Sequence, residues 1–234
     1  MSRLILVILG FSVLIILTTI TTLSSHAQQD EGEYNISFLW AFGVLVKEKE
    51  GEGQKLVSIT RDTQLKSGAR IKFFVKLEKS SFVYLVYHSS QGDVTVLFPY
   101  RFGQLSSGYQ APVQDYIPQG NEWFELDKHV GLETFYLLAS AERLHDLEQS
   151  INKYETADPS RKPELAEKIL GEIRRLGKKH MKFTTLAEKP ANITGLLRAG
   201  EKVEKGDYPD VASLAVQIRS KDFFSRAFTI DHRK

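Results

Sequence analysis

The segment Arg70–Pro99 (RIKFFVKLEKSSFVYLVYHSSQGDVTVLFP) constrains the fold of this 234-residue chain more than any other. In its first part, large apolar residues alternate with two lysines, which is typical of a β-strand with one buried face. Phe82–His88 is apolar at nearly every position, as in the central strand of a sheet. Gln91-Gly92-Asp93 predicts a hairpin turn into a further strand at Val94–Phe98. Three consecutive strands therefore form the predicted core of a β-domain.

More strands are predicted on both sides of this segment. Asn35–Val46 places large apolar residues on one face, and the last strand, Phe223–Ile230, runs almost to the C-terminus. Shorter strands are predicted at Leu56–Thr60, Trp123–Leu126, Leu132–Ala139, Ile193–Leu197 and Ala212–Arg219. Most connections are too short to hold a crossover helix, which favours antiparallel pairing. We therefore predict a mainly β protein, an antiparallel β-sandwich or open barrel that is immunoglobulin-like in character.

Two amphipathic helices interrupt the strands. Ala141–Tyr154 and Glu164–Lys179 carry apolar residues at helical spacing, and a proline-containing turn separates them. They predict an α-helical hairpin, inserted at about 141–184 into a single β-domain that spans residues 35–232. The apolar stripe of the second helix either packs on this domain or stays exposed and docks a partner helix; it comprises Leu165, Ile169, Ile173 and Leu176.

The N-terminus has the layout of a secretory signal peptide. Arg3 is followed by an uncharged apolar stretch and by the small-residue site Ser25-His26-Ala27, which predicts a signal peptide at 1–27 with cleavage after Ala27. The alternative is an uncleaved signal anchor at Leu4–Leu23. A polar tether at 28–34 follows. Both alternatives place the rest of the chain outside the cytoplasm, in the periplasm or at the cell surface, with membrane contact only through an uncleaved N-terminal segment.

The composition argues against several classes of partner and chemistry. The chain has 31 basic and 29 acidic residues, so it has no strong field to attract nucleic acid or an anionic membrane. It has no cysteine, which removes disulfides, thiolate nucleophiles and cysteine-containing metal sites. The basic run near Lys178 is interleaved with acids upstream, which is typical of a solvated helix face.

Several motifs follow one another along the chain: LKSGARIKFFVKLEKSSFVYLVY, GDVTVLFP, YIP, WFELD and GLETFYLLAS, which lie between Leu65 and Ser140, and FFSRAFTIDH at Phe223–His232. This series of motifs resembles a bacterial family, the domain of unknown function number 4384. The resemblance implies an exported or membrane-tethered domain, found alone or beside caspase-like peptidase or kinase domains. The family supplies no catalytic or ligand residues that can be carried over.

Catalytic and metal-binding patterns are absent from the sequence. It has no G-x-S-x-G or H-E-x-x-H motif, and its six histidines have no metal-ligand spacing. We therefore predict no catalytic constellation, no metal site and no cofactor. The alternative is an envelope hydrolase that acts on glycan or ester through clustered carboxylates paired with a histidine; the candidates are Glu125, Asp127 and Glu133 with His88 or His129.

An aromatic loop is the strongest candidate for a binding surface. It follows the third core strand and comprises Phe98, Tyr100, Arg101, Phe102 and Tyr109. Aromatic residues and arginine dominate interface energetics, and loops held by a rigid sheet commonly carry binding sites. The alternative is that these rings cap the end of the sandwich. We expect a non-catalytic extracytoplasmic module that binds another envelope protein or a surface ligand.

Overall fold

The computed structural model describes residues 34–47, 54–106, 111–180, 187–190 and 209–234. Residues 34–234 make up one compact unit. The predicted signal peptide, the tether before residue 34 and the predicted strand at Ile193–Leu197 lie outside the described residues. Within the described ranges, every helix is too short or too polar to cross a lipid bilayer.

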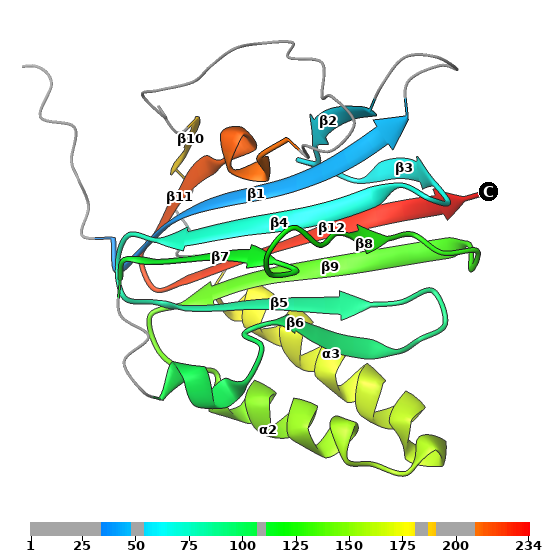
Figure 1. Cartoon of the computed structure of the whole chain (residues 1–234). Coiled ribbons are helices and arrows are strands. Elements are labelled where there is room, and N and C mark those ends of the chain that lie inside the picture. The colour runs from blue at the N-terminus through cyan, green and yellow to red at the C-terminus, as the bar shows by residue number, and fades with distance from the viewer. Residues whose placement is uncertain (1–33, 48–53, 107–110, 181–186, 191–208) are drawn as a thin grey trace, which may run out of the picture. The chain divides into compact units, whose positions relative to one another are not determined.

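The first sheet contains the long N-terminal strand at its centre. Its main order is β10-β11-β1-β4-β7, with β2 also paired to β1 and β8 to β4 (Figure 1). The strands are β1 (Ile36–Lys47), β2 (Gln54–Ser58), β4 (Arg70–Leu77), β7 (Val113–Ile117), β8 (Phe124–Glu125), β10 (Ala187–Pro190) and β11 (Val216–Ser220). All the pairings in this sheet are antiparallel.

The second sheet has the order β3-β12-β9-β5-β6. Its strands are β3 (Thr63–Lys66), β5 (Phe82–His88), β6 (Val94–Phe98), β9 (Gly131–Ser140) and β12 (Phe223–Arg233). The C-terminal strand β12 lies between β9 and β3, and it pairs with β3 in parallel. The last residues of the chain are therefore built into the sheet.

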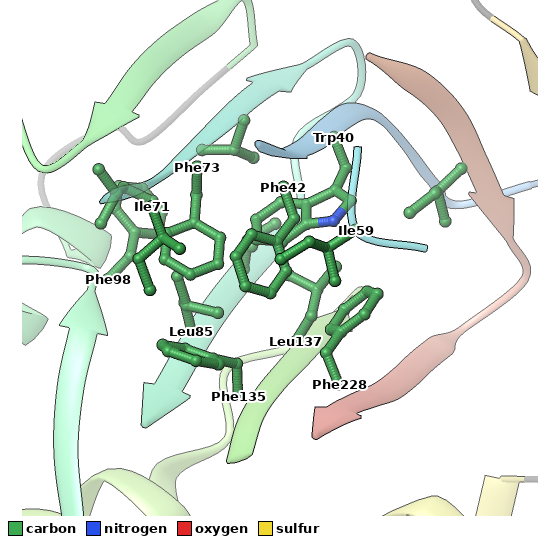
Figure 2. Close-up of a cluster of buried hydrophobic side chains, with 14 of the residues drawn as sticks. Trp40, Phe42, Ile59, Ile71, Phe73, Leu85, Phe98, Phe135, Leu137 and Phe228 are labelled. Atoms are coloured by element: carbon green, nitrogen blue, oxygen red, sulfur yellow. The ribbon is translucent and has the colours of Figure 1, made fainter. Parts of the chain in front are cut away.

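The core lies between the two sheets and is rich in aromatic rings. Figure 2 shows Phe42 and Phe73 from the first sheet facing Phe135 and Phe228 from the second. The ring centroids of Phe42 and Phe73 lie 4.3 Å apart, and those of Phe73 and Phe135 lie 5.2 Å apart. Burying such a side chain contributes about 1.5–3 kcal/mol, so this cluster is a major source of stability for a chain without disulfides.

The helices α2 (His145–Glu155) and α3 (Lys162–His180) cover the outer face of the second sheet (Figure 1). Their apolar stripes pack against Tyr84 of β5 and Leu138 of β9. The Tyr84 hydroxyl donates to Glu148 on α2 over 2.7 Å, and Glu148 also pairs with Arg143. The stripe predicted on the second helix is thus packed on the domain, with Ile169, Ile173 and Leu176 buried and Leu165 partly buried.

The short 3-10 helix η4 (Val211–Leu214) covers part of the outer face of the first sheet. It packs against Ala41 and Phe74, and it approaches β1 at Gly43, where a Cβ atom would lie 2.4 Å from Val211 Cγ2. Only glycine permits this close approach. The segment predicted as a strand at Ala212–Arg219 therefore begins as a helical turn, and its strand is confined to Val216–Ser220.

The fold class is confirmed: the protein is mainly β, with one helical hairpin. The two sheets are not closed into a barrel, which decides between the two architectures left open by the sequence in favour of the sandwich. The pairing of β3 with β12 is the one parallel pairing among the described strands. Nothing in the local sequence of Thr63–Lys66 indicated this partner, because it lies at the opposite end of the chain.

Candidate functional site

The predicted aromatic loop is largely folded back onto the domain. Phe98 is fully buried in the core, and Phe102 packs partly buried beside Tyr84 at the start of the 3-10 helix η1 (Phe102–Leu105). Tyr100 and Arg101 keep exposed side chains. Tyr109 lies outside the described residues. Of the four predicted binding residues that the structure describes, two neighbouring ones are therefore exposed.

Tyr100 connects this loop to a hollow on the outer face of the first sheet. Its hydroxyl donates to the backbone carbonyl of Tyr116 on β7 over 2.6 Å, and desolvation raises its pKa to about 12. The hollow has a volume of about 270 Å³. We call it the Lys72 pocket, and its walls are Lys72, Tyr116, Gly120, Asn121, Trp123, Pro209, Asp210 and Val211.

The strand pattern of β4 directs Lys72 into this pocket. Ile71 and Phe73 point into the sandwich core, so the residue between them points to the outer face of the sheet. On a free sheet face a lysine would be solvated. Here η4 and the turn before β8 surround it, and only 5% of Lys72 remains exposed.

Two backbone carbonyls and two rings hold the Lys72 ammonium. Nζ donates to Gly120 O over 2.5 Å and to Glu122 O over 2.8 Å. The same nitrogen lies 5.6 Å from the ring centroids of both Tyr116 and Trp123, within the range of cation–π attraction. Desolvation lowers the pKa of Lys72, while the carboxylates of Asp210 and Glu122 act in the opposite direction.

Asp210 forms the polar wall opposite the strand. Its Oδ1 accepts hydrogen bonds from the Tyr116 hydroxyl over 3.0 Å and from the Ala212 amide over 2.9 Å. The second of these bonds caps the start of η4. Burial and then the hydrogen bond to Asp210 raise the pKa of Tyr116 to about 12, so its hydroxyl stays protonated. The pocket therefore presents two rings, an ammonium and a carboxylate in fixed positions.

A second hollow of about 580 Å³ runs along the basic face of α3, beside Gly171, Arg174, Arg175, Lys178 and Lys179. It is wide open to solvent, and its lining side chains come from one helix face. Arg174 and Arg175 each lie 3.7 Å from a glutamate oxygen on the same helix. Because such exposed pairs leave flexible, hydrated side chains, this larger hollow is a weaker candidate for a binding site.

The three acids of the hydrolase alternative each have different partners or surroundings. Glu125 pairs with Arg70 over 3.2 Å, and Asp127 pairs with His129 over 2.6 Å at the surface. The hydrogen bonds from His129 lower the pKa of Asp127. Glu133 is buried. None of these acids lines either of the two hollows.

His88 is partly exposed at the end of β5, and the pairing with β9 sets it opposite Thr134. Among the described residues, no group of three potential ligands lies close enough to hold a metal ion.

The structure brings together a serine, a histidine and a glutamate that the sequence did not connect. Ser67 Oγ lies 3.0 Å from His232 Nε2, and His232 Nδ1 lies 3.9 Å from Glu133 Oε1. Glu133 also accepts from the Tyr87 hydroxyl and, over 3.2 Å, from the Ser90 amide. His232 was missed because the parallel pairing of β12 with β3 places it beside the turn that carries Ser67.

Besides a nucleophile and a base, acyl transfer requires an oxyanion hole. It is formed by backbone amides that point at the reacting oxygen. The amides of Ser67, Gly68 and Ala69 instead donate to carbonyls within the fold, over 2.7–3.1 Å. Neither of the two hollows adjoins Ser67.

A comparison with known families matches one segment of the chain. Residues 64–143 match the family model described as "Domain of unknown function (DUF4384)", which confirms the resemblance inferred from the motifs between Leu65 and Ser140. The motif at Phe223–His232 lies outside the matched range. No curated protein and no solved structure matches the chain. The matched segment contains β4, β7 and β8, and so it contains Lys72, Tyr116 and Trp123.

Proposed function

We propose that this chain, with its DUF4384 segment, is a non-catalytic binding module of the bacterial envelope and that its ligand enters the Lys72 pocket. The observation that carries the proposal is the placement of Lys72, a buried lysine whose ammonium lies 5.6 Å from each of two aromatic ring centroids at the wall of a cavity. Ligand sites are commonly concave, with aromatic walls and a few polar groups in fixed positions. The Lys72 pocket has each of these properties.

The pocket is held by rigid elements, which supports binding without a large conformational change. Lys72 and Tyr116 lie on paired strands of the first sheet, with Phe74 opposite Tyr116. The rings of Phe74 and Tyr116 pack 5.2 Å apart beneath η4. Sites built on such elements keep their geometry better than sites on loops. The ordering entropy on binding is correspondingly small.

The proposed location rests on the N-terminal sequence. An apolar stretch after Arg3 and a small-residue site at Ala27 support export. A chain without cysteine can fold in an oxidising compartment without forming wrong disulfides. Partners in the envelope therefore remain the expected class: another envelope protein or a surface ligand.

Sedimentation with envelope fractions tests the proposed function. The purified protein is mixed with isolated cell-wall and membrane fractions, and the bound amount is compared with that of Lys72→Met. Lys76→Met is the matched control, because it removes the same charge from the same face of β4 but lies outside the pocket lining. We expect binding by the wild type and the control and at least a tenfold loss in Lys72→Met. Equal binding by all three proteins would refute the pocket as the site.

The second candidate function is hydrolysis, which the hydrogen bond between Ser67 and His232 favours, with Glu133 Oε1 3.9 Å from the other ring nitrogen of His232. Activation of Ser67 would make it reactive toward a fluorophosphonate. Covalent labelling that is lost in Ser67→Ala would establish this candidate and contradict the non-catalytic proposal. Because the neighbouring amides are committed within the fold, we expect no labelling.

A further inference from the structure

We infer that the ligand of the Lys72 pocket is a neutral sugar ring. This inference rests on the proposed function, because it names the class of ligand for the same pocket. The charges around the pocket, its two aromatic rings and its size each point to this class.

The charge balance of the pocket disfavours an anionic ligand. The single ammonium, that of Lys72, already donates two of its three hydrogens to backbone carbonyls. The carboxylates of Asp210 and Glu122 both act on it. A ligand carboxylate or phosphate in the pocket would meet the Asp210 carboxylate of its wall and one largely committed ammonium, so its desolvation would not be repaid.

A cationic ligand is disfavoured for the opposite reason. Aromatic pockets bind ammonium ligands by offering the negative faces of their rings. Here the Lys72 ammonium already lies 5.6 Å from both ring centroids, so the chain's own cation occupies the position that a ligand cation would take. A second cation would be repelled at close range. A neutral ligand remains.

The remaining groups fit a ring that is apolar on its faces and hydroxylated at its edge. Trp123 and Tyr116 are partly exposed in the pocket wall, where their ring carbons beside Lys72 offer apolar surface to the C–H groups of a sugar. Within the described part of the chain, both hydrogen bonds of Asp210 end at Oδ1, which leaves Oδ2 to accept from a hydroxyl. The Asn121 side chain is exposed and offers an amide donor and acceptor. A sugar hydroxyl that donates to the Asp210 carboxylate would form a charge-assisted hydrogen bond, which is stronger than a bond between neutral groups.

The size of the pocket limits the ligand to about one ring. Its volume of about 270 Å³ lies just below the usual range of about 300–1,000 Å³ for pockets that enclose drug-sized ligands. A single sugar unit of a longer glycan matches this size, with neighbouring units outside. Because one ring makes few contacts, a dissociation constant on the order of 1 mM is expected for a monosaccharide.

The protein carries its own reporter for this interaction. It has two tryptophans: Trp40, which is 3% exposed in the core, and Trp123 at the pocket wall. Acrylamide, a neutral quencher, therefore acts mainly on Trp123 in the wild-type protein. A bound sugar ring shields Trp123, so quenching by acrylamide falls as the sugar concentration rises. No tryptophan has to be replaced for the measurement.

The experiment titrates the full-length protein with three classes of probe while quenching is followed. The probes are neutral monosaccharides (glucose, galactose and N-acetylglucosamine), anions (acetate and inorganic phosphate) and a cation (tetramethylammonium). We expect saturable protection of Trp123 by at least one monosaccharide only. In Asp210→Asn, which keeps the cap of η4 but removes the charge, we expect protection to require at least tenfold more sugar. Lys76→Met should bind as the wild type does.

Each other outcome contradicts the inference of a sugar ligand. The sedimentation assay then shows whether the proposed function fails with it. Saturation by an anion or by tetramethylammonium overturns the sugar class while the pocket remains a binding site. Protection by no probe, together with envelope binding that depends on Lys72, overturns the sugar class alone. Protection by no probe, with envelope binding unaffected by Lys72→Met, overturns both.

Discussion

Replacement of Gly43 by alanine is expected to destabilise the protein and to deform the Lys72 pocket from a distance. An added Cβ would lie 2.4 Å from Val211 Cγ2 and 3.1 Å from Leu56 Cδ1. Carbon atoms in normal contact are about 3.5–4.0 Å apart, so Val211 must move by about 1 Å or more. Val211 is a wall of the pocket, and the adjacent Asp210 holds Tyr116. Gly43 itself does not line the pocket.

The expected change in the free energy of unfolding is the difference between two opposing effects. Overpacking a well-filled site costs about 1–3 kcal/mol. Alanine in place of glycine at a compatible backbone position contributes about 0.4–1 kcal/mol of stability through the unfolded state. Taken at the middle of each range, about 2 and about 0.7 kcal/mol, the two effects leave a net loss of about 1–2 kcal/mol for Gly43→Ala. With a urea m-value of about 2 kcal/mol/M, the unfolding midpoint falls by about 0.5–1 M.

A double-mutant cycle identifies the contact responsible. In Gly43→Ala/Val211→Ala the clashing Cγ2 is absent, so the double variant should be more stable than the sum of the single variants predicts, by about 1 kcal/mol or more. Gly103→Ala is the control, because its added Cβ meets no atom within 4 Å. A Gly43→Ala protein as stable as the wild type, or strict additivity in the cycle, would refute the reasoning.

The remaining predictions address the core, a buried ion pair, the loop and export. Phe42→Ala should cost about 3–5 kcal/mol in chemical denaturation, since its buried ring contacts three other rings. Burial alone would raise the pKa of Glu148, but its hydrogen bonds with Arg143 and Tyr84 hold this pKa below the usual value. The contribution of the ionised Glu148 to the free energy of unfolding is therefore complete above its unfolded pKa of about 4.3. It is lost as the pH falls through the folded pKa, which is lower. Glu148→Gln should cost about 1–3 kcal/mol at pH 7, and this loss should shrink as the pH falls through the folded pKa of Glu148. A loss of stability that stays constant with pH would contradict this sign. Tyr100→Phe should cost about 1 kcal/mol by removing the bond to β7, measured by thermal unfolding. The protein isolated from its native cells should begin at Gln28 in N-terminal sequencing, and a retained Met1 would indicate the anchor instead.

The sequence by itself determined the type of fold, because the signals for it are local. Alternation with a period of two around Ile71 and Phe73 requires a strand with one buried face, whatever lies opposite. The helical spacing from Ala141 onward is equally local. Together these two signals were sufficient to predict a mainly β domain with a helical hairpin, which the structure confirms. Phe98 shows the limit of such patterns, because an aromatic residue at the end of a strand fits a core and a binding loop equally well.

Only the tertiary structure decided where the candidate site lies. Alternation along β4 shows that Lys72 faces away from the core, but it contains no information on what covers that face. The cover comes from η4, about 140 positions further along the chain, and its close approach depends on Gly43 of another strand. Similarly, His232 meets Ser67 only because β12 pairs in parallel with β3. Contacts of this kind depend on register and packing across the whole domain, and the residues concerned carry no mark of them in their own neighbourhood of the sequence.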